Sequence, residues 1–140
     1  MTGYAKTVGR GLAIGLICAA ATGAVAVAQA IEVEEAVLGD ATVRLYLHPF
    51  LTPDELTTLR LVMTNEQALA LFVPNADGFA ALAAAPAEGV IREGQPVASA
   101  IALAELPDAA AASKAATAAC DQAKAGGEPC VVVLEVAPAQ

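Results

Sequence analysis

Hydrophobic and polar residues alternate along positions 42–48 of the chain. Aliphatic side chains stand between the polar ones, which are Thr42, Arg44, Tyr46 and His48. A period of two is typical of a strand with one buried face. The pattern therefore predicts a half-buried strand that ends near His48.

Three acidic residues precede this strand, namely Glu32, Glu34 and Glu35. A calcium loop needs regularly spaced oxygen ligands and a glycine at its sharp turn, and this stretch has neither. The sequence therefore predicts a solvated segment that leads into the strand, with no metal site.

The next segment predicts a helix over residues 53–64. Thr52 is a good N-cap, Pro53 suits the first helical position, and Glu55 completes a capping box. Leucines and a methionine then recur on one helical face. Polar and apolar residues also alternate over 57–63, so a strand remains the alternative for that stretch.

Three apolar runs in the middle of the chain predict strands over residues 68–74, 78–86 and 97–106. The first two are separated by the turn-forming sequence Asn-Ala-Asp-Gly at 75–78, which favours a hairpin. Residues 87–96 read as a polar connection.

The last third predicts a helix followed by a buried strand. Asp108 is placed to cap the alanine-rich segment 109–124, and glycines follow that segment at 126 and 127. Residues 130–138 are β-branched and almost wholly apolar. The order of elements predicts an α+β domain with a mostly antiparallel sheet and two helices on one face, close to a ferredoxin-like arrangement with an added strand.

The first thirty residues have the features of a secretory signal peptide. A basic start is followed by an apolar run from 11 to 27 and by the small residues that flank a cleavage site after Ala30. Cleavage leaves a single domain from Ile31 to residue 140, periplasmic or secreted. An uncleaved membrane anchor is the alternative. A lipoprotein signal fits less well, because Ile17 precedes Cys18.

The charge of residues 31–140 limits the classes of partner. This part contains all fifteen acidic residues and five of the seven basic ones, which gives a net charge of −10. Nucleic-acid binding needs clusters of lysine and arginine, so that class is excluded. An anionic membrane surface would repel the cleaved chain.

Two cysteines remain after cleavage, Cys120 and Cys130. Their spacing is C-x9-C, whereas thiol redox sites use C-x-x-C. A zinc site needs four ligands, and the chain's one histidine, His48, is 72 residues upstream. In an oxidising compartment the pair predicts a structural disulfide, with a redox pair or a metal site as the weaker alternatives.

The segment 78–136 resembles a family of small secreted bacterial domains of unknown function. The shared features are the run GFAALAAAP, an alanine-rich helix with AAC, a short glycine-containing loop and PCVVV. The resemblance implies secretion and a structural disulfide. Similar chains also carry the name aminolevulinate synthase, an enzyme whose cofactor needs a Schiff-base lysine in a large domain. The cleaved chain offers Lys114 and Lys124, both in one predicted helix, so no cofactor is predicted.

Few residues are candidates for catalysis. His48 is the only histidine, and Asp54 is the nearest downstream carboxylate. Ser99 and Ser113 lack a G-x-S-x-G context, and no glycine-rich phosphate loop is present. The sequence favours a non-catalytic binding or structural domain of the cell envelope, whose partner is an envelope protein or a small apolar ligand. A small hydrolase-like enzyme that uses His48 and Asp54 is the alternative.

Overall fold

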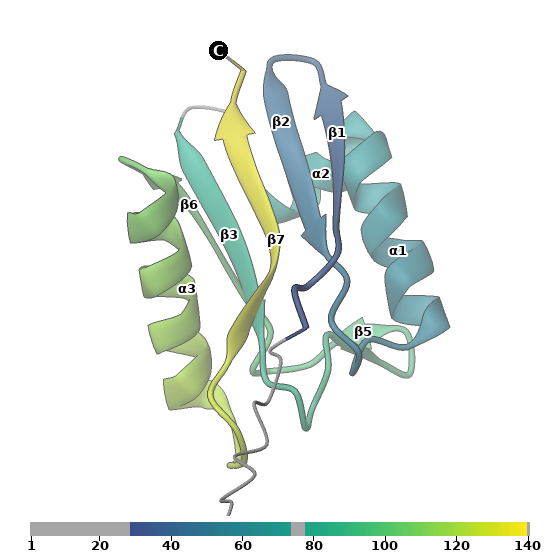
Figure 1. Ribbon diagram of the computed structural model, residues 1–140, viewed down its shortest axis with the longest axis vertical. Coiled ribbons are helices and arrows are strands. Elements are labelled where there is room, and N and C mark those ends of the chain that lie inside the picture. Colours follow the sequence, from purple (N-terminus) through teal and green to yellow (C-terminus); the bar gives the residue numbers. More distant parts are fainter. Residues whose placement is uncertain (1–28, 74–77, 140) are drawn as a thin grey trace, which may run out of the picture.

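The computed structural model describes residues 29–73 and 78–139. Its five-stranded antiparallel sheet has the order β1-β2-β7-β3-β6 (Figure 1). The strands are β1 (Val33–Leu38), β2 (Ala41–Tyr46), β3 (Phe79–Ala84), β6 (Ile101–Leu106) and β7 (Val131–Pro138). The helices are α1 (Pro53–Thr64), α2 (Glu66–Phe72) and α3 (Ala109–Ala123), and a small hairpin joins β4 (Ile91–Arg92) to β5 (Gln95–Pro96). Residues 1–28 of the predicted signal peptide and residues 75–77 of the predicted turn lie outside the described residues.

The α+β class and the mostly antiparallel sheet are confirmed, and the helices cover both faces of the sheet. Along β3, Ala80, Leu82 and Ala84 belong to the core under α1 and α2. The alternate residues Ala81 and Ala83 belong to a second, alanine-rich core under α3. Because successive side chains of a strand point to opposite faces, α1 and α3 lie on opposite sides. The prediction that both predicted helices share one face, as in a ferredoxin-like fold, was wrong.

The predicted solvated segment before β2 is instead a strand. β1 pairs with β2 along its whole length, from Val33 opposite Tyr46 to Leu38 opposite Ala41. The strands are joined by a two-residue turn in which Gly39 has φ +58°, a conformation that favours glycine at the first turn position. The sequence pattern did not predict this strand, because the adjacent Glu34 and Glu35 interrupt the alternation of apolar and polar residues.

The helix over 53–64 is confirmed with its capping box, but residues 68–74 do not form the predicted strand. They belong mostly to α2, because the Asn65 side chain accepts a hydrogen bond from the Ala68 N–H at 2.9 Å and starts a new helix. The predicted hairpin with 78–86 is therefore also wrong. β3 pairs with β6 and β7.

The polar connection 87–96 contains β4 and β5 and is held against α1 by Glu55. The Glu55 carboxylate accepts hydrogen bonds from the backbone N–H groups of Val90 at 2.7 Å and Ile91 at 3.0 Å, besides its capping bond to Thr52. Only 4% of Glu55 is exposed. The predicted strand 97–106 begins later, at Ile101, because residues 97–100 form a turn in which the Ala100 N–H donates to the Val97 carbonyl.

The predicted disulfide is confirmed. Cys120, at the end of α3, is bonded to Cys130, just before β7, with 6.0 Å between their Cα atoms. Both residues are buried in the alanine-rich core. The bridge therefore ties the last turn of α3 to the strand at the centre of the sheet.

Candidate functional site

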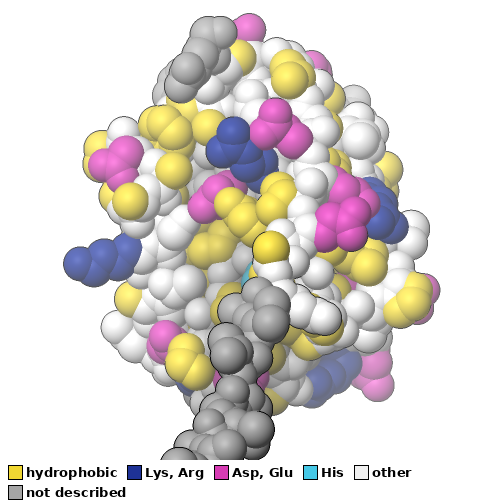
Figure 2. All heavy atoms as spheres, viewed as in Figure 1, with side chains coloured by type: hydrophobic (Ala, Val, Ile, Leu, Met, Phe, Trp, Pro, Cys, Tyr) yellow, Lys and Arg dark blue, Asp and Glu magenta, His cyan; other side chains and the backbone are white. Residues whose placement is uncertain are grey.

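Among the residues that the structure describes, no helix covers one part of the sheet. α3 lies over β3, β6 and β7, whereas the same face of β1 and β2 remains accessible to solvent. We call this surface the open face; its side chains are Val33, Glu35, Val37, Thr42, Arg44, Tyr46 and Glu135. Figure 2 shows the molecule from the side of the open face, where hydrophobic side chains are exposed among acidic and basic ones. A groove of about 470 Å³ lies between the open face and the start of α3.

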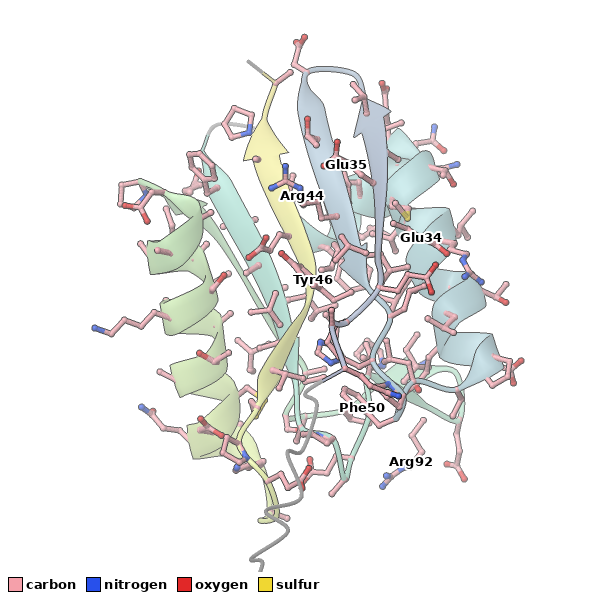
Figure 3. The ribbon with its side chains drawn as sticks, viewed as in Figure 1. Glu34, Glu35, Arg44, Tyr46, Phe50 and Arg92 are labelled. Atoms are coloured by element: carbon pink, nitrogen blue, oxygen red, sulfur yellow. A yellow bond between two sulfur atoms is a disulfide. The ribbon has the colours of Figure 1, made fainter. Side chains whose placement is uncertain are left out.

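Charged side chains form a row across the open face. Glu35, Arg44 and Glu135 lie directly opposite one another on β1, β2 and β7. The Arg44 Nε donates to Glu35 Oε2 at 2.7 Å. Figure 3 shows Arg44 and Tyr46 over this face. Since directly opposite residues are the closest across a ladder, the row fixes one cationic group between two carboxylates.

Glu135 is held by two hydroxyl groups. The Tyr46 hydroxyl donates to Oε2 at 2.6 Å, and the Ser113 hydroxyl, from α3, donates to Oε1 at 2.7 Å. Burial, and then the hydrogen bond to Glu135, raise the pKa of Tyr46 to about 12. Tyr46 therefore stays protonated at neutral pH and acts as a donor. The cluster links β2, β7 and α3 and presents fixed polar atoms beside the groove.

His48 is engaged with the backbone. Its Nε2 lies 2.7 Å from the carbonyl oxygen of Val132, so this nitrogen carries the proton and donates it. The ring stacks on Phe50 with 5.5 Å between centroids and lies 6.4 Å from the ring of Tyr46. The histidine thus extends the pairing between the end of β2 and the start of β7.

The structure does not bring His48 and Asp54 together. Asp54 is exposed in the first turn of α1, and its backbone carbonyl accepts a hydrogen bond from the Thr58 hydroxyl at 3.0 Å. Among the residues that the structure describes, no hydrogen bond or ion pair joins Asp54 to His48. A general base oriented by a carboxylate, as in a catalytic triad, is therefore not formed by this pair.

We expect His48→Gln to change the free energy of unfolding by less than about 0.5 kcal/mol, because the glutamine amide can donate to the same Val132 carbonyl. His48→Ala leaves that carbonyl without its donor and should cost about 1 kcal/mol. Urea denaturation of both variants tests this. A glutamine variant as unstable as the alanine variant would show that ring stacking, not the hydrogen bond, fixes this position.

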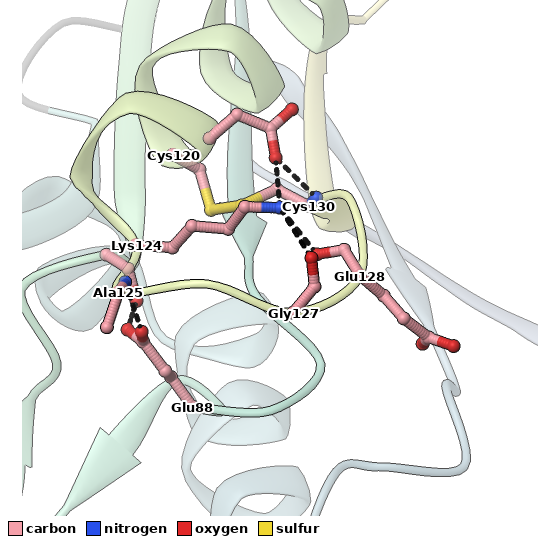
Figure 4. Close-up of polar contacts among 9 residues, drawn as sticks. Glu88, Cys120, Lys124, Ala125, Gly127, Glu128 and Cys130 are labelled. Carbon is pink, nitrogen blue, oxygen red and sulfur yellow. Dashed lines mark hydrogen bonds and ion pairs between the residues drawn. A yellow bond between two sulfur atoms is a disulfide. The ribbon is translucent and has the colours of Figure 1, made fainter.

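Both serines and Lys124 have structural partners, and Lys114 is exposed on α3. The buried Ser99 hydroxyl donates to Glu88, and Ser113 donates to Glu135. Lys124 contacts Asp121 at 2.9 Å and donates to the Glu128 carbonyl at 2.6 Å, which closes the loop beside the disulfide (Figure 4). Across residues 29–73 and 78–139, no three His, Cys, Asp or Glu side chains come close enough to hold a metal ion.

Sequence reasoning missed the Glu135 cluster. The alternation of residues 42–48 predicts only that Arg44 and Tyr46 lie on the polar side of a strand, and the apolar run 130–138 includes Glu135. A signal was present, because Glu135 is the one charged residue in the run 130–138. A lone carboxylate in a central strand requires hydrogen-bond donors from neighbouring elements.

Comparisons of the chain with protein-family models, with curated proteins and with solved structures find no match. The resemblance to a secreted family therefore stays a prediction.

Proposed function

We propose that the protein is an exported domain of the periplasm or cell envelope that binds a partner through the open face and performs no catalysis of its own. The observation that carries this proposal is the groove beside α3. It combines accessible apolar side chains with polar atoms from Arg44, Glu135 and Thr42. An envelope protein or a small apolar ligand fits this mixture of surfaces.

The bonding of the polar groups supports binding over catalysis. The Glu135 carboxylate accepts from two hydroxyls, and the protonated nitrogen of His48 faces a carbonyl. Ser113 donates to a carboxylate that also accepts from Tyr46, so its hydroxyl is part of a network that joins α3 to the sheet. Groups held in this way orient a ligand well, because their positions are fixed before it arrives.

Export is supported by two features. A disulfide forms and persists in an oxidising compartment, and the first thirty residues have the basic and then apolar pattern that predicts a signal peptide. Within the described ranges, no helix combines the length and the apolar character that crossing a membrane needs.

The proposal predicts that a partner is recovered with tagged protein purified from the envelope, and that Thr42→Arg abolishes recovery. The long side chain would fill the groove beside Arg44. Leu71→Arg is the matched control, because it adds the same charge at a position on α2 that is 84% exposed. The intact mass of the purified protein should correspond to a chain that starts at Ile31.

Three outcomes would contradict the proposal. A mass that includes residues 1–30 would support the anchor alternative. Equal recovery with Thr42→Arg would remove the groove as the binding surface. Hydrolytic turnover by the wild-type protein that is lost in His48→Gln would support the enzyme alternative.

A further inference from the structure

β1 is an outer strand of the sheet, and half of its backbone groups point away from β2. The Leu47 N–H donates to the Glu32 carbonyl at 2.8 Å, so residue 32 bonds toward β2. Because the direction alternates along an antiparallel pair, the groups of Val33, Glu35 and Val37 point outward. Within the described ranges, no backbone hydrogen bond meets these outward groups. Such an edge is a template for one further strand.

The space beside β1 is the right shape for that strand. A hollow of about 760 Å³ lies between β1 and the outer side of α1, and Ala36 and Leu61 are among its lining residues. Leu61 is 56% exposed at this place. An added strand would direct alternate side chains into this hollow and the others over the open face.

Exposed apolar side chains gather along the same edge. Five large hydrophobic residues of the described ranges are exposed, and four of them lie on α1, on β1 or just before β1: Ile31 at 39%, Val33 at 43%, Val37 at 71% and Leu61 at 56%. A strand paired with β1 would cover them from both sides. A cluster of this kind, rimmed by charged residues, is typical of an interaction surface.

The charges beside β1 indicate which strand would bind. Glu32, Glu34 and Glu35 lie on or next to the edge, and residues 31–140 carry a net charge of −10. Arg60 binds Glu34 through two nitrogens, at 2.6 and 2.9 Å, and Figure 3 shows Glu34 on the side of β1 that faces α1. This ion pair holds β1 against α1, and the net charge keeps the whole molecule strongly acidic.

A second copy of the chain fits this edge poorly. Two-fold pairing of β1 with itself is antiparallel, and it brings Glu34 and Glu35 of both copies within a few positions of one another. Each copy would also carry the full negative charge, which opposes association.

We propose that β1 binds an extended, basic segment of another exported protein by strand addition. Lysine or arginine side chains of this segment would lie over the open face beside Glu35, with their aliphatic stems against Val33 and Val37, and the alternate aliphatic side chains would enter the hollow beside Leu61. Main-chain hydrogen bonds to the outward groups of β1 would supply affinity, and the alternate side chains would supply specificity. This inference rests on the proposed binding function, adds the edge of β1 as a binding surface beside the groove, and names the class of the partner.

The test is a titration of the ¹⁵N-labelled, exported protein with a synthetic peptide of alternating lysine and valine. We expect amide shifts to concentrate in β1 and at Leu61. Val37→Pro removes one outward N–H without touching the β1–β2 ladder and should weaken binding about tenfold. Val37→Thr, which keeps the N–H, is the matched control and should bind nearly as the wild type does.

A change in the peptide tests strand pairing on the unaltered protein, so the result does not depend on whether Val37→Pro folds. Methylation of alternate peptide nitrogens blocks strand pairing and should abolish binding to the unaltered protein. A glutamate–valine peptide should not bind. The inference would be overturned if the methylated or the acidic peptide bound with equal affinity, or if Val37→Pro bound the peptide as the wild type does. It would also be overturned by shifts centred on the other outer strand, β6, or by self-association of the protein without peptide.

The inference and the proposed function fail in different ways. If Val37→Pro and the wild type recover the same partner from the envelope, the binding function stands and strand addition at β1 is wrong. If neither recovers a partner but the peptide binds as expected at β1, the inference stands and the proposed groove is wrong.

Discussion

Replacing Glu55 with alanine is expected to lower the free energy of unfolding by about 3 to 4 kcal/mol. The carboxylate satisfies the N–H groups of Thr52, Val90 and Ile91, and Val90 is almost fully buried. Alanine leaves these donors without a partner, removes half of the capping box and opens space under the β4–β5 hairpin. The loss thus combines three effects that usually occur at separate positions.

The pH dependence of stability should reveal the same carboxylate. Burial raises the pKa of Glu55, but the hydrogen bonds from Ile91, Thr52 and Val90 outweigh it and hold the pKa below its ordinary value. A carboxyl whose pKa is lowered on folding stabilises the fold above its unfolded pKa of about 4.3 and loses that contribution as the pH falls through its folded value. The difference in stability between the wild type and Glu55→Gln should therefore be largest near neutral pH and shrink below about pH 4.

Asp54→Asn is the matched control for these measurements. Asp54 is the neighbouring carboxylate in the first turn of α1, and its side chain is exposed. It should cost less than about 0.5 kcal/mol, through the helix dipole alone. Urea denaturation followed by circular dichroism at several pH values measures all three variants. Equal losses of stability for Asp54→Asn and Glu55→Ala would show that the hydrogen bonds between Glu55 and the β4–β5 hairpin do not stabilise the fold.

Removal of the disulfide is expected to have the second large effect. Replacing both Cys120 and Cys130 with alanine should lower the free energy of unfolding by about 3 kcal/mol, because the bridge closes a short loop in the unfolded chain. Alanine is the suitable replacement, since both sulfur atoms lie in a core made largely of alanine methyl groups. Thermal unfolding measures the loss.

The double variant should still fold and bind. Asp121 accepts a hydrogen bond from the Cys130 N–H at 2.9 Å, and Lys124 holds the carbonyl of Glu128, so the loop keeps its non-covalent contacts. The control is the wild type with reductant, whose melting temperature should approach that of the variant. Loss of partner recovery from a folded double variant would contradict a purely structural role and favour a redox or metal function.

Features determined by nearby residues could be predicted from the sequence. Thr52 and Glu55 determine where α1 begins, and Asp108 caps α3 by accepting from the Ala111 N–H at 2.7 Å. The strand that follows Cys130 is continuous and apolar because β7 is buried at the centre of the sheet. In each case the signal lies within a few residues of the element that it determines.

Features that depend on distant contacts could not be predicted in this way. Nothing near Glu88 in sequence indicates that it binds the N–H of Ala125, and nothing near Glu135 indicates Tyr46 as its donor. The error at 68–74 has a different cause. A short apolar run suits a buried strand or a helix equally well, and the Asn65 cap decides between them.

The central position of β7 has a consequence for how the chain matures. β7 lies between the β1–β2 hairpin and the β3–β6 pair, yet it follows all of these strands in the chain. During synthesis the two earlier pairs therefore emerge with their inner edges exposed, and they cannot join until residues 131–138 arrive. A chain with this order of strands completes its sheet only after its last strand has been synthesised.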